Sequence, residues 1–167
     1  MAAPTIAASG GAIIAESRKT LPAALAVTSA ELPSDGLSKL HLATMRSNGT
    51  LEVEVNDPDA ALRVDALIDG DLSTLARSNG INPLVVTLTL AEPVLLKAVR
   101  VFATHSPHDW VLEPLPSEGR LLIQNAPGHA WSTIELEEPR KTSVIRVEVL
   151  RLERDDYVHL NDIELYV

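Results

Sequence analysis

The sequence predicts an all-β fold, an eight-stranded jelly-roll β-sandwich that follows an N-terminal arm. From Leu37 onward, short segments alternate apolar and polar residues between turn signals, which is typical of a β-sandwich. Residues 1–36 are instead rich in Ala, Ser, Thr, Gly and Pro, and the breakers among them leave no room for a helix longer than about two or three turns. We therefore expect an arm at 1–36 and a sandwich at 37–167.

Eight segments show the alternation expected of strands, and eight strands can form a jelly roll. The first two flank Ser47-Asn48-Gly49, and Asn-Gly between two such runs predicts a hairpin. Between the second and third, Asp57 and Pro58 predict the start of a short helical turn over 59–64. In chain order the expected strands are 40–45, 50–55, 84–90, 95–104, 120–125, 131–136, 143–150 and 160–167.

Charge and composition narrow the function classes. The formal net charge is -9, and residues 1–47 hold four basic and three acidic residues, so ten basic and twenty acidic residues remain in the rest. The negative charge of this domain repels phosphate backbones and anionic lipids, so we expect neither nucleic-acid nor membrane binding. No apolar run approaches the roughly 18 residues of a membrane span, which predicts a soluble protein. Cysteine is absent, which excludes disulfides and thiolate chemistry.

Six segments occur in the order and spacing of one known family. The chain resembles the discoidin-like (coagulation factor 5/8 type C, galactose-binding-like) β-sandwiches over roughly residues 64–167. No single segment is specific for this family, but the six segments in this order are. The segments are Asp69-Gly-Asp-Leu-Ser-Thr-Leu-Ala76, Thr89-Leu-Ala-Glu-Pro93, Ala98-Val-Arg-Val101, Gln124-Asn-Ala-Pro-Gly-His-Ala-Trp131, Val144-Ile-Arg-Val147 and Leu160-Asn-Asp-Ile-Glu-Leu-Tyr166.

The chain also departs from the family pattern. Ala76 stands where the family usually has Trp, Thr89 where it has Asp, and Asp162 where it has Glu, and no cysteine pair links the ends of the domain. Strand order and core alternation do not depend on these positions, so the resemblance implies the fold. It does not carry over any particular ligand. By the same resemblance, Trp131 is expected in the core.

The resemblance implies a structural calcium between the first acidic turn and the closing strand. Calcium takes six to eight oxygen ligands from carboxylates and carbonyls, and the matching positions carry oxygen donors at Asp69, Asp71, Thr74 and Asp162. Asp162 reaches less far than the usual Glu. The alternative is that Asp69 and Asp71 only hydrogen-bond their own backbone in the turn.

Sugar binding would need an apolar platform surrounded by planar hydrogen-bonding groups. One set of candidates follows the acidic turn, and the other lies in an expected loop after Phe102. Alternatively, Trp110 packs over the end of the sandwich and the histidines are exposed to solvent without binding a ligand. The two histidines with Asp109 lack a fourth ligand for a transition-metal site. The candidates are Arg77, Asn79, Asn82, His105, His108, Asp109 and Trp110.

Two readings of function follow from these observations. No Gly-x-Ser-x-Gly elbow or other local nucleophile signature is present, so we expect no enzyme. The first reading is a non-catalytic interaction module in a larger assembly, such as a virion or other extracellular particle, that docks on other protein subunits through residues 1–36. The second is a carbohydrate-binding module that recognises glycans. Fold alone does not choose between them.

Overall fold

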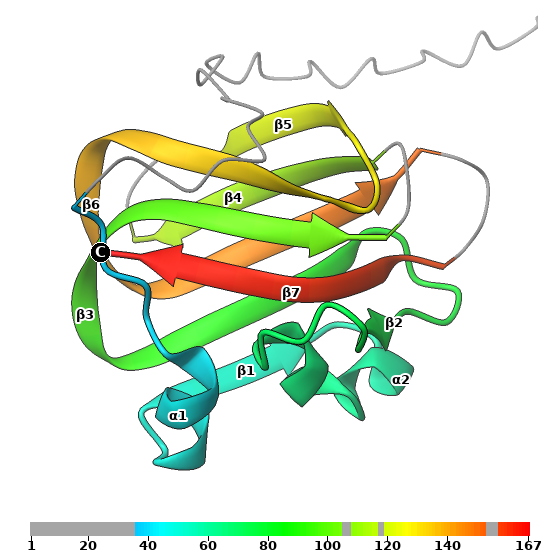
Figure 1. Cartoon of the computed structure of the whole chain (residues 1–167), viewed down its shortest axis with the longest axis horizontal. Helices are drawn as coiled ribbons and strands as arrows, with labels where there is room; N and C mark the ends of the chain where they lie inside the picture. Colours follow the sequence, from blue (N-terminus) through cyan, green and yellow to red (C-terminus); the bar gives the residue numbers. More distant parts are fainter. Residues whose placement is uncertain (1–35, 105–107, 117–118, 153–156) are drawn as a thin grey trace, which may run out of the picture.

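The computed structural model describes residues 36–104, 108–116, 119–152 and 157–167 (Figure 1). The arm predicted at 1–36 and its docking on other subunits lie outside these residues, except for Gly36. Within the described part, the chain forms two layers of antiparallel strands with short helices at one side of them. None of the described helices is long and apolar enough to cross a membrane.

Two long strands build both layers of the sandwich. β3 (Leu84–Ala103) and β6 (Ala130–Arg151) pair antiparallel along most of their length, with a register shift between Thr89 and Val94. Residues 91–93 at this shift are exposed, and Pro93 lacks the N–H that a regular ladder would use. Both strands bend at this point, so the two halves of each belong to different layers (Figure 1).

Five shorter strands complete the layers: β1 (Leu51–Val55), β2 (Ala76–Arg77), β4 (His108–Leu115), β5 (Leu121–Ala126) and β7 (His159–Tyr166). The first layer contains β1, the first half of β3, the second half of β6, β4 and β5. The second contains β2, β7 and the other halves of β3 and β6. Ser38 and Leu40 donate backbone hydrogen bonds of 2.9 Å to Val167 and Leu165, which extends the edge of the second layer.

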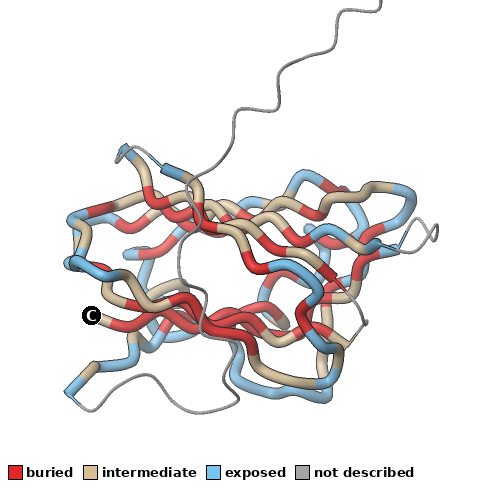
Figure 2. The backbone as a smooth tube through the Cα atoms, turned by 90° about the horizontal axis from the view of Figure 1, so that it is seen from above, coloured by how far each residue is buried: buried red, intermediate tan, exposed pale blue. Residues whose placement is uncertain are grey.

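The core lies between the layers. Every second residue in the first half of β3 is buried. A second register shift, between Leu96 and Ala98, exchanges the two faces of the strand, and beyond it Val99, Val101 and Ala103 face the core. Figure 2 shows buried residues running along the strands and exposed residues in their connections. Each fully buried Leu, Ile or Val side chain stabilises the fold by about 1.5 to 3 kcal/mol relative to exposure. The largest fully buried side chains of the core are those of Trp110, Leu67, Leu84, Leu88, Leu96, Leu112, Ile123, Ile134, Ile145, Leu160, Ile163 and Leu165.

The predicted all-β sandwich is confirmed, although the strands are divided differently. The segments expected at 84–90 and 95–104 are one bent strand, β3, and those at 131–136 and 143–150 are the single strand β6. The sequence shows turn signals at both bends, but backbone pairing continues beyond them because the two strands bend together.

The helical turn predicted after Asp57 is confirmed as α2 (Pro58–Ala61). Asp57 is the N-cap, and its Oδ1 accepts hydrogen bonds from the N–H groups of Asp59 and Ala60, both at 2.9 Å. Pro58 occupies the first turn, where its missing N–H costs nothing. The 3₁₀ helix η1 (Val64–Leu67) follows and buries Val64 and Leu67.

The hairpin predicted around Ser47-Asn48-Gly49 is wrong. Its first arm is the helix α1 (Leu42–Ser47), and only its second arm is a strand. Asn48 is the C-cap residue, and its N–H bonds to the Thr44 carbonyl at 3.1 Å. Gly49 follows with φ +77°, the left-handed conformation that commonly ends a helix. The Asn-Gly pair therefore ends a helix and does not join two strands.

Trp110 is packed, which is the alternative to a ligand-binding role, and Trp131, which is expected in the core, does not lie there. The stretch around Trp110, expected to be a loop, is β4, and Trp110 is fully buried in the core. Trp131 is only half-buried. It pairs with Phe102 on the outer face of the second layer, where the two ring centroids lie 5.5 Å apart at 69°, and the Arg100 guanidinium lies 4.5 Å above the Trp131 ring.

Candidate functional site

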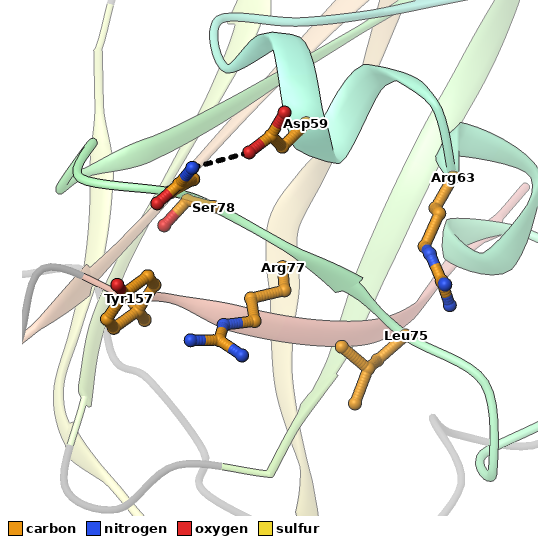
Figure 3. Close-up of a pocket in the computed structure, with 7 residues that line it drawn as sticks. Asp59, Arg63, Leu75, Arg77, Ser78 and Tyr157 are labelled. Carbon is orange, nitrogen blue, oxygen red and sulfur yellow. Dashed lines mark hydrogen bonds between the residues drawn. The ribbon is translucent and has the colours of Figure 1, made fainter.

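A cavity of about 480 Å³ lies between α2 and β2, at the end of the sandwich where β3 and β7 begin (Figures 1 and 3). Its size falls in the range of small-ligand sites, which combine apolar walls with a few convergent polar groups. Leu75 and Tyr157 supply the large apolar surfaces, and the other groups are polar or charged. The lining residues are Asp59, Arg63, Leu75, Arg77, Ser78, Asn79 and Tyr157.

The short strand β2 determines which side chains face this cavity. It pairs with the start of β7, with Ala76 opposite Leu160 and Arg77 opposite His159. Ala76 and Ser78 are buried, and because side chains alternate along a strand, Arg77 points outward. Ser78 continues the pairing: its N–H donates to the Val158 carbonyl at 3.0 Å, and its Oγ accepts from the Val158 N–H at 2.8 Å. This pairing fixes Tyr157, the neighbour of Val158, at the mouth of the cavity.

A buried carboxylate ties the two walls together. Asp57 caps α2 with Oδ1, and its Oδ2 accepts the backbone N–H of Asn79 at 2.8 Å. The Asn79 side-chain amide then donates to Asp59 Oδ2 at 2.6 Å (Figure 3). Because both oxygens of Asp57 are engaged by backbone donors, the wall around Asp59 and Asn79 is held in place before any ligand arrives.

The opposite wall is aromatic and cationic. The guanidinium carbon of Arg77 lies 4.0 Å from the centroid of the Tyr157 ring. Tyr157 is 37% exposed, an unusual fraction for a large aromatic side chain in this molecule. Arg63 comes from the segment after α2 and extends along the same wall region as Leu75 (Figure 3). An aromatic ring bordered by arginine and amide groups can contact a flat ligand face and hydrogen-bond its edge.

The structure separates the predicted ligand-binding residues. Arg77 and Asn79 line the cavity. Asn82 does not: its side chain brackets the backbone of Arg151, with the amide N donating at 3.0 Å and the amide O accepting at 3.1 Å.

The described members of the second set, from the expected loop, do not meet in a shared cavity. His108 and Trp110 are 1% and 0% exposed and point into the sandwich from β4, so a solvent-borne ligand cannot reach them. Asp109 Oδ1 accepts the backbone N–H of Asn125 at 2.8 Å. His105 lies outside the described residues.

Sequence reasoning missed five residues that line this cavity: Asp59, Arg63, Leu75, Ser78 and Tyr157. The signal for α2 was present at Asp57 and Pro58, but nothing local showed that its outer side faces Asn79. Tyr157 could be found only from the pairing of β2 with β7, which is a long-range contact.

The acidic turn has its own hydrogen bonds. Asp69 Oδ1 accepts the backbone N–H of Asp71 at 2.8 Å, and the Thr74 hydroxyl donates to Asp69 Oδ2 at 2.9 Å. Asp71 Oδ1 accepts the Ser73 hydroxyl at 2.6 Å and its N–H at 2.9 Å, and this side-chain hydrogen bond lowers the pKa of Asp71. These are the contacts expected of a turn that is stabilised by its own aspartates.

Asp162 lies in a different environment. It is buried on β7, and its Oδ1 accepts the backbone N–H of Ile163 at 3.0 Å. Burial, reinforced by the nearby Glu164 carboxylate, raises the pKa of Asp162 to about 7. Asp162 and Asp69 both line a second cavity of about 130 Å³.

The described residues contain no group of three or more His, Asp or Glu side chains placed to hold a metal ion. Asp71 Oδ1 is engaged by Ser73, and the raised pKa of Asp162 weakens its preference for the charged form that calcium would bind. Calcium at Asp69, Asp71, Thr74 and Asp162 therefore remains a prediction from the resemblance.

No protein-family model matches the sequence, and no curated protein does. Solved structures do match. The family 32 carbohydrate-binding module of NanJ from C. perfringens, in complex with galactose, aligns with a TM-score of 0.57 and 9% identity over 78% of this chain and 99% of that one. A second module, CpGH89CBM32-5 from Clostridium perfringens in complex with GalNAc-β-1,3-galactose, aligns with a TM-score of 0.56 and 11% identity over 78% and 100%.

An F5/8 type C domain from Bacteroides fragilis also aligns, with a TM-score of 0.55 and 14% identity over 80% of this chain and 97% of that one. Other matches are parts of glycoside hydrolases. At these identities the likeness shows the fold. The chain has the discoidin-like, galactose-binding-like β-sandwich fold that the ordered segments predicted.

Proposed function

We propose that this chain is a non-catalytic carbohydrate-binding module that holds a glycan in the cavity between α2 and β2. The observation that carries the proposal is the composition of that cavity, in which exposed Tyr157 stands beside Arg77 and opposite the Asp59–Asn79 pair. The matching carbohydrate-binding modules support this reading over the role in a larger assembly, which rests on residues 1–36.

The cavity offers the two kinds of contact that a pyranose needs. The C–H face of a sugar ring is apolar and can pack on Tyr157 and Leu75. Sugar hydroxyls both donate and accept, and the opposite wall presents a carboxylate and an amide that are already held in place by Asp57. A prearranged wall reduces the entropy cost of binding.

The same cavity argues for binding without catalysis. Glycoside hydrolysis commonly uses two carboxyl groups on either side of the scissile bond. Asp59 is the one carboxylate among the described lining residues, and Asn79 already donates to it at 2.6 Å. A lone hydrogen-bonded carboxylate can orient a hydroxyl group, but it supplies only one of the two carboxyl groups that this mechanism uses.

The test is a calorimetric titration of the full chain with galactose and with GalNAc-β-1,3-galactose. We expect binding of at least one sugar, and we expect Tyr157→Ala to weaken it about tenfold or more because an aromatic contact of roughly 1 to 3 kcal/mol is lost. Leu95→Ala is the matched control, because Leu95 is 51% exposed at the bend of β3, at the other end of the sandwich. Equal affinities in the wild type and in Tyr157→Ala would place the glycan elsewhere, and no binding of either sugar would count against the proposal.

A further inference from the structure

Two arginines differ from all the others that the structure describes. In a chain with 23 acidic and 14 basic residues, carboxylate partners for arginine are plentiful. Arg140 and Arg151 have interactions of their own. Arg63 and Arg77 pair with no carboxylate of the described residues, and both line the cavity. The arginines with ion pairs are Arg46 with Asp65, Arg100 with Glu164, Arg120 with Glu148, and Arg146 with Glu113 and Glu148.

Within the described part of the chain, the two aspartates next to the cavity are already engaged. Asp59 accepts the Asn79 amide, and Asp57 is buried with both oxygens bonded to backbone N–H groups. Arg77 contacts the Tyr157 ring, which leaves the edge of its guanidinium open to a ligand. Arg63 and Arg77 therefore line one cavity together with Asp59, and neither arginine pairs with a carboxylate among the residues that the structure describes (Figure 3).

A guanidinium group presents a planar fork of donors that matches the two oxygens of a carboxylate or sulfate. A neutral sugar hydroxyl uses only one donor of that fork. We propose that the glycan bound here is acidic, and that Arg63 and Arg77 receive its carboxylate or sulfate group. This inference rests on the proposed function and specifies the class of its ligand.

The experiment compares three probes on the full chain by calorimetry: galactose, galacturonate and galactose 6-sulfate. We expect at least one of the two anionic sugars to bind about tenfold or more tightly than galactose, as charge-assisted hydrogen bonds are stronger than neutral ones. The stronger of the two anionic probes identifies the group as carboxylate or sulfate. Arg63→Gln and Arg77→Gln should each reduce the affinity ratio of the anionic sugar to galactose by about fivefold or more.

Lys141→Gln is the matched control, since Lys141 is an exposed cation at the bend of β6, away from the cavity, and its substitution should leave the ratio unchanged. Thermal unfolding of each variant verifies that it is folded. If galactose binds as tightly as both anionic sugars, the ligand class is wrong while the proposed function stands. Failure of all three sugars to bind would overturn both. An anionic preference that survives both arginine substitutions would also overturn the inference, because the anion would then bind elsewhere.

Discussion

Two clusters of charged and aromatic groups among the described residues are built in opposite ways. On the outer face of the second layer, Glu164 accepts from Arg100 at 3.0 Å and from the Tyr166 hydroxyl at 2.7 Å, and it also pairs with Lys39. Most of this cluster is buried. In the cavity beside β2, Arg63 and Arg77 are exposed and have no carboxylate partner among the described residues.

The difference shows how the same residue types serve structure in one place and binding in another. Burial alone would raise the pKa of Glu164, but the hydrogen bonds from Lys39 and Tyr166 and the charge of Arg100 hold it below its usual value. That carboxylate is fully engaged by its own protein. The cavity leaves its cations and its aromatic ring available to a ligand.

The largest expected effect comes from the paired cluster. Glu164→Gln removes the charge that compensates buried Arg100, and stranding one member of a buried ion pair destabilises a protein by about 3 kcal/mol. We expect this loss in the free energy of unfolding measured with urea, with glycan affinity unchanged. Glu92→Gln, at the exposed bend of β3, is the control and should change neither quantity. Weakened glycan binding in Glu164→Gln would show that the two clusters are not separate.

Asp57 is the residue whose substitution should affect both the stability of the fold and the binding of the glycan. Asp57→Ala removes an N-cap and the bond to the Asn79 backbone, so we expect about 2 kcal/mol of lost stability together with weaker glycan binding. Asp57→Asn retains one acceptor oxygen, so its stability and its glycan affinity should lie between those of the wild type and of Asp57→Ala. An Ala variant that is destabilised but binds glycan normally would remove Asp57 from the account of how the cavity is held.

Asp162 gives a smaller, pH-dependent effect in the paired region. Because burial raises its pKa in the folded state to about 7, the folded protein binds a proton that the unfolded protein releases near pH 4. Stability should therefore fall as the pH rises from 5 to 7, by roughly 1 to 2 kcal/mol. Asp162→Asn should flatten this dependence. Glu164, with its lowered pKa, acts in the opposite direction and below this window.

A pH profile that is identical in the wild type and in Asp162→Asn would show that Asp162 is ionised throughout. That result would also remove one obstacle to calcium, because the carboxylate would then be free of its proton at neutral pH. Glycan affinity should not change with Asp162→Asn in either case, since Asp162 does not line the glycan cavity.

The sandwich was predictable because most of its strands carry local alternation, and the ordered segments identify the fold. β4 was missed although its residues alternate, because Asp109, Glu113 and Pro114 resemble loop residues. The helix α1 was missed because Asn48-Gly49 is compatible with both a hairpin and a helix end. In each case the local sequence is compatible with two backbone structures, and long-range packing determines which of them forms.

Two of the seven residues that line the cavity were predictable from the sequence. Arg77 and Asn79 follow the acidic turn that the resemblance identifies, so their place at one end of the sandwich could be expected. Tyr157 and Asp59 reach the same cavity through the pairing of β2 with β7 and the cap on α2. The burial of Trp110 could not be decided from the sequence, because a tryptophan beside histidines fits a binding loop and a buried strand equally well.

The most direct test of the central claim is an amide chemical-shift titration of the full chain with galactose and with GalNAc-β-1,3-galactose. If the cavity beside β2 is the binding site, the largest shifts should occur at Arg77, Asn79 and Tyr157, while the amides of Arg100, Glu164 and Tyr166 should stay within experimental error. Their saturation should give a single affinity that weakens in Tyr157→Ala. Shifts concentrated on the Glu164 cluster, or no saturable shifts anywhere, would contradict the assignment of glycan binding to this cavity.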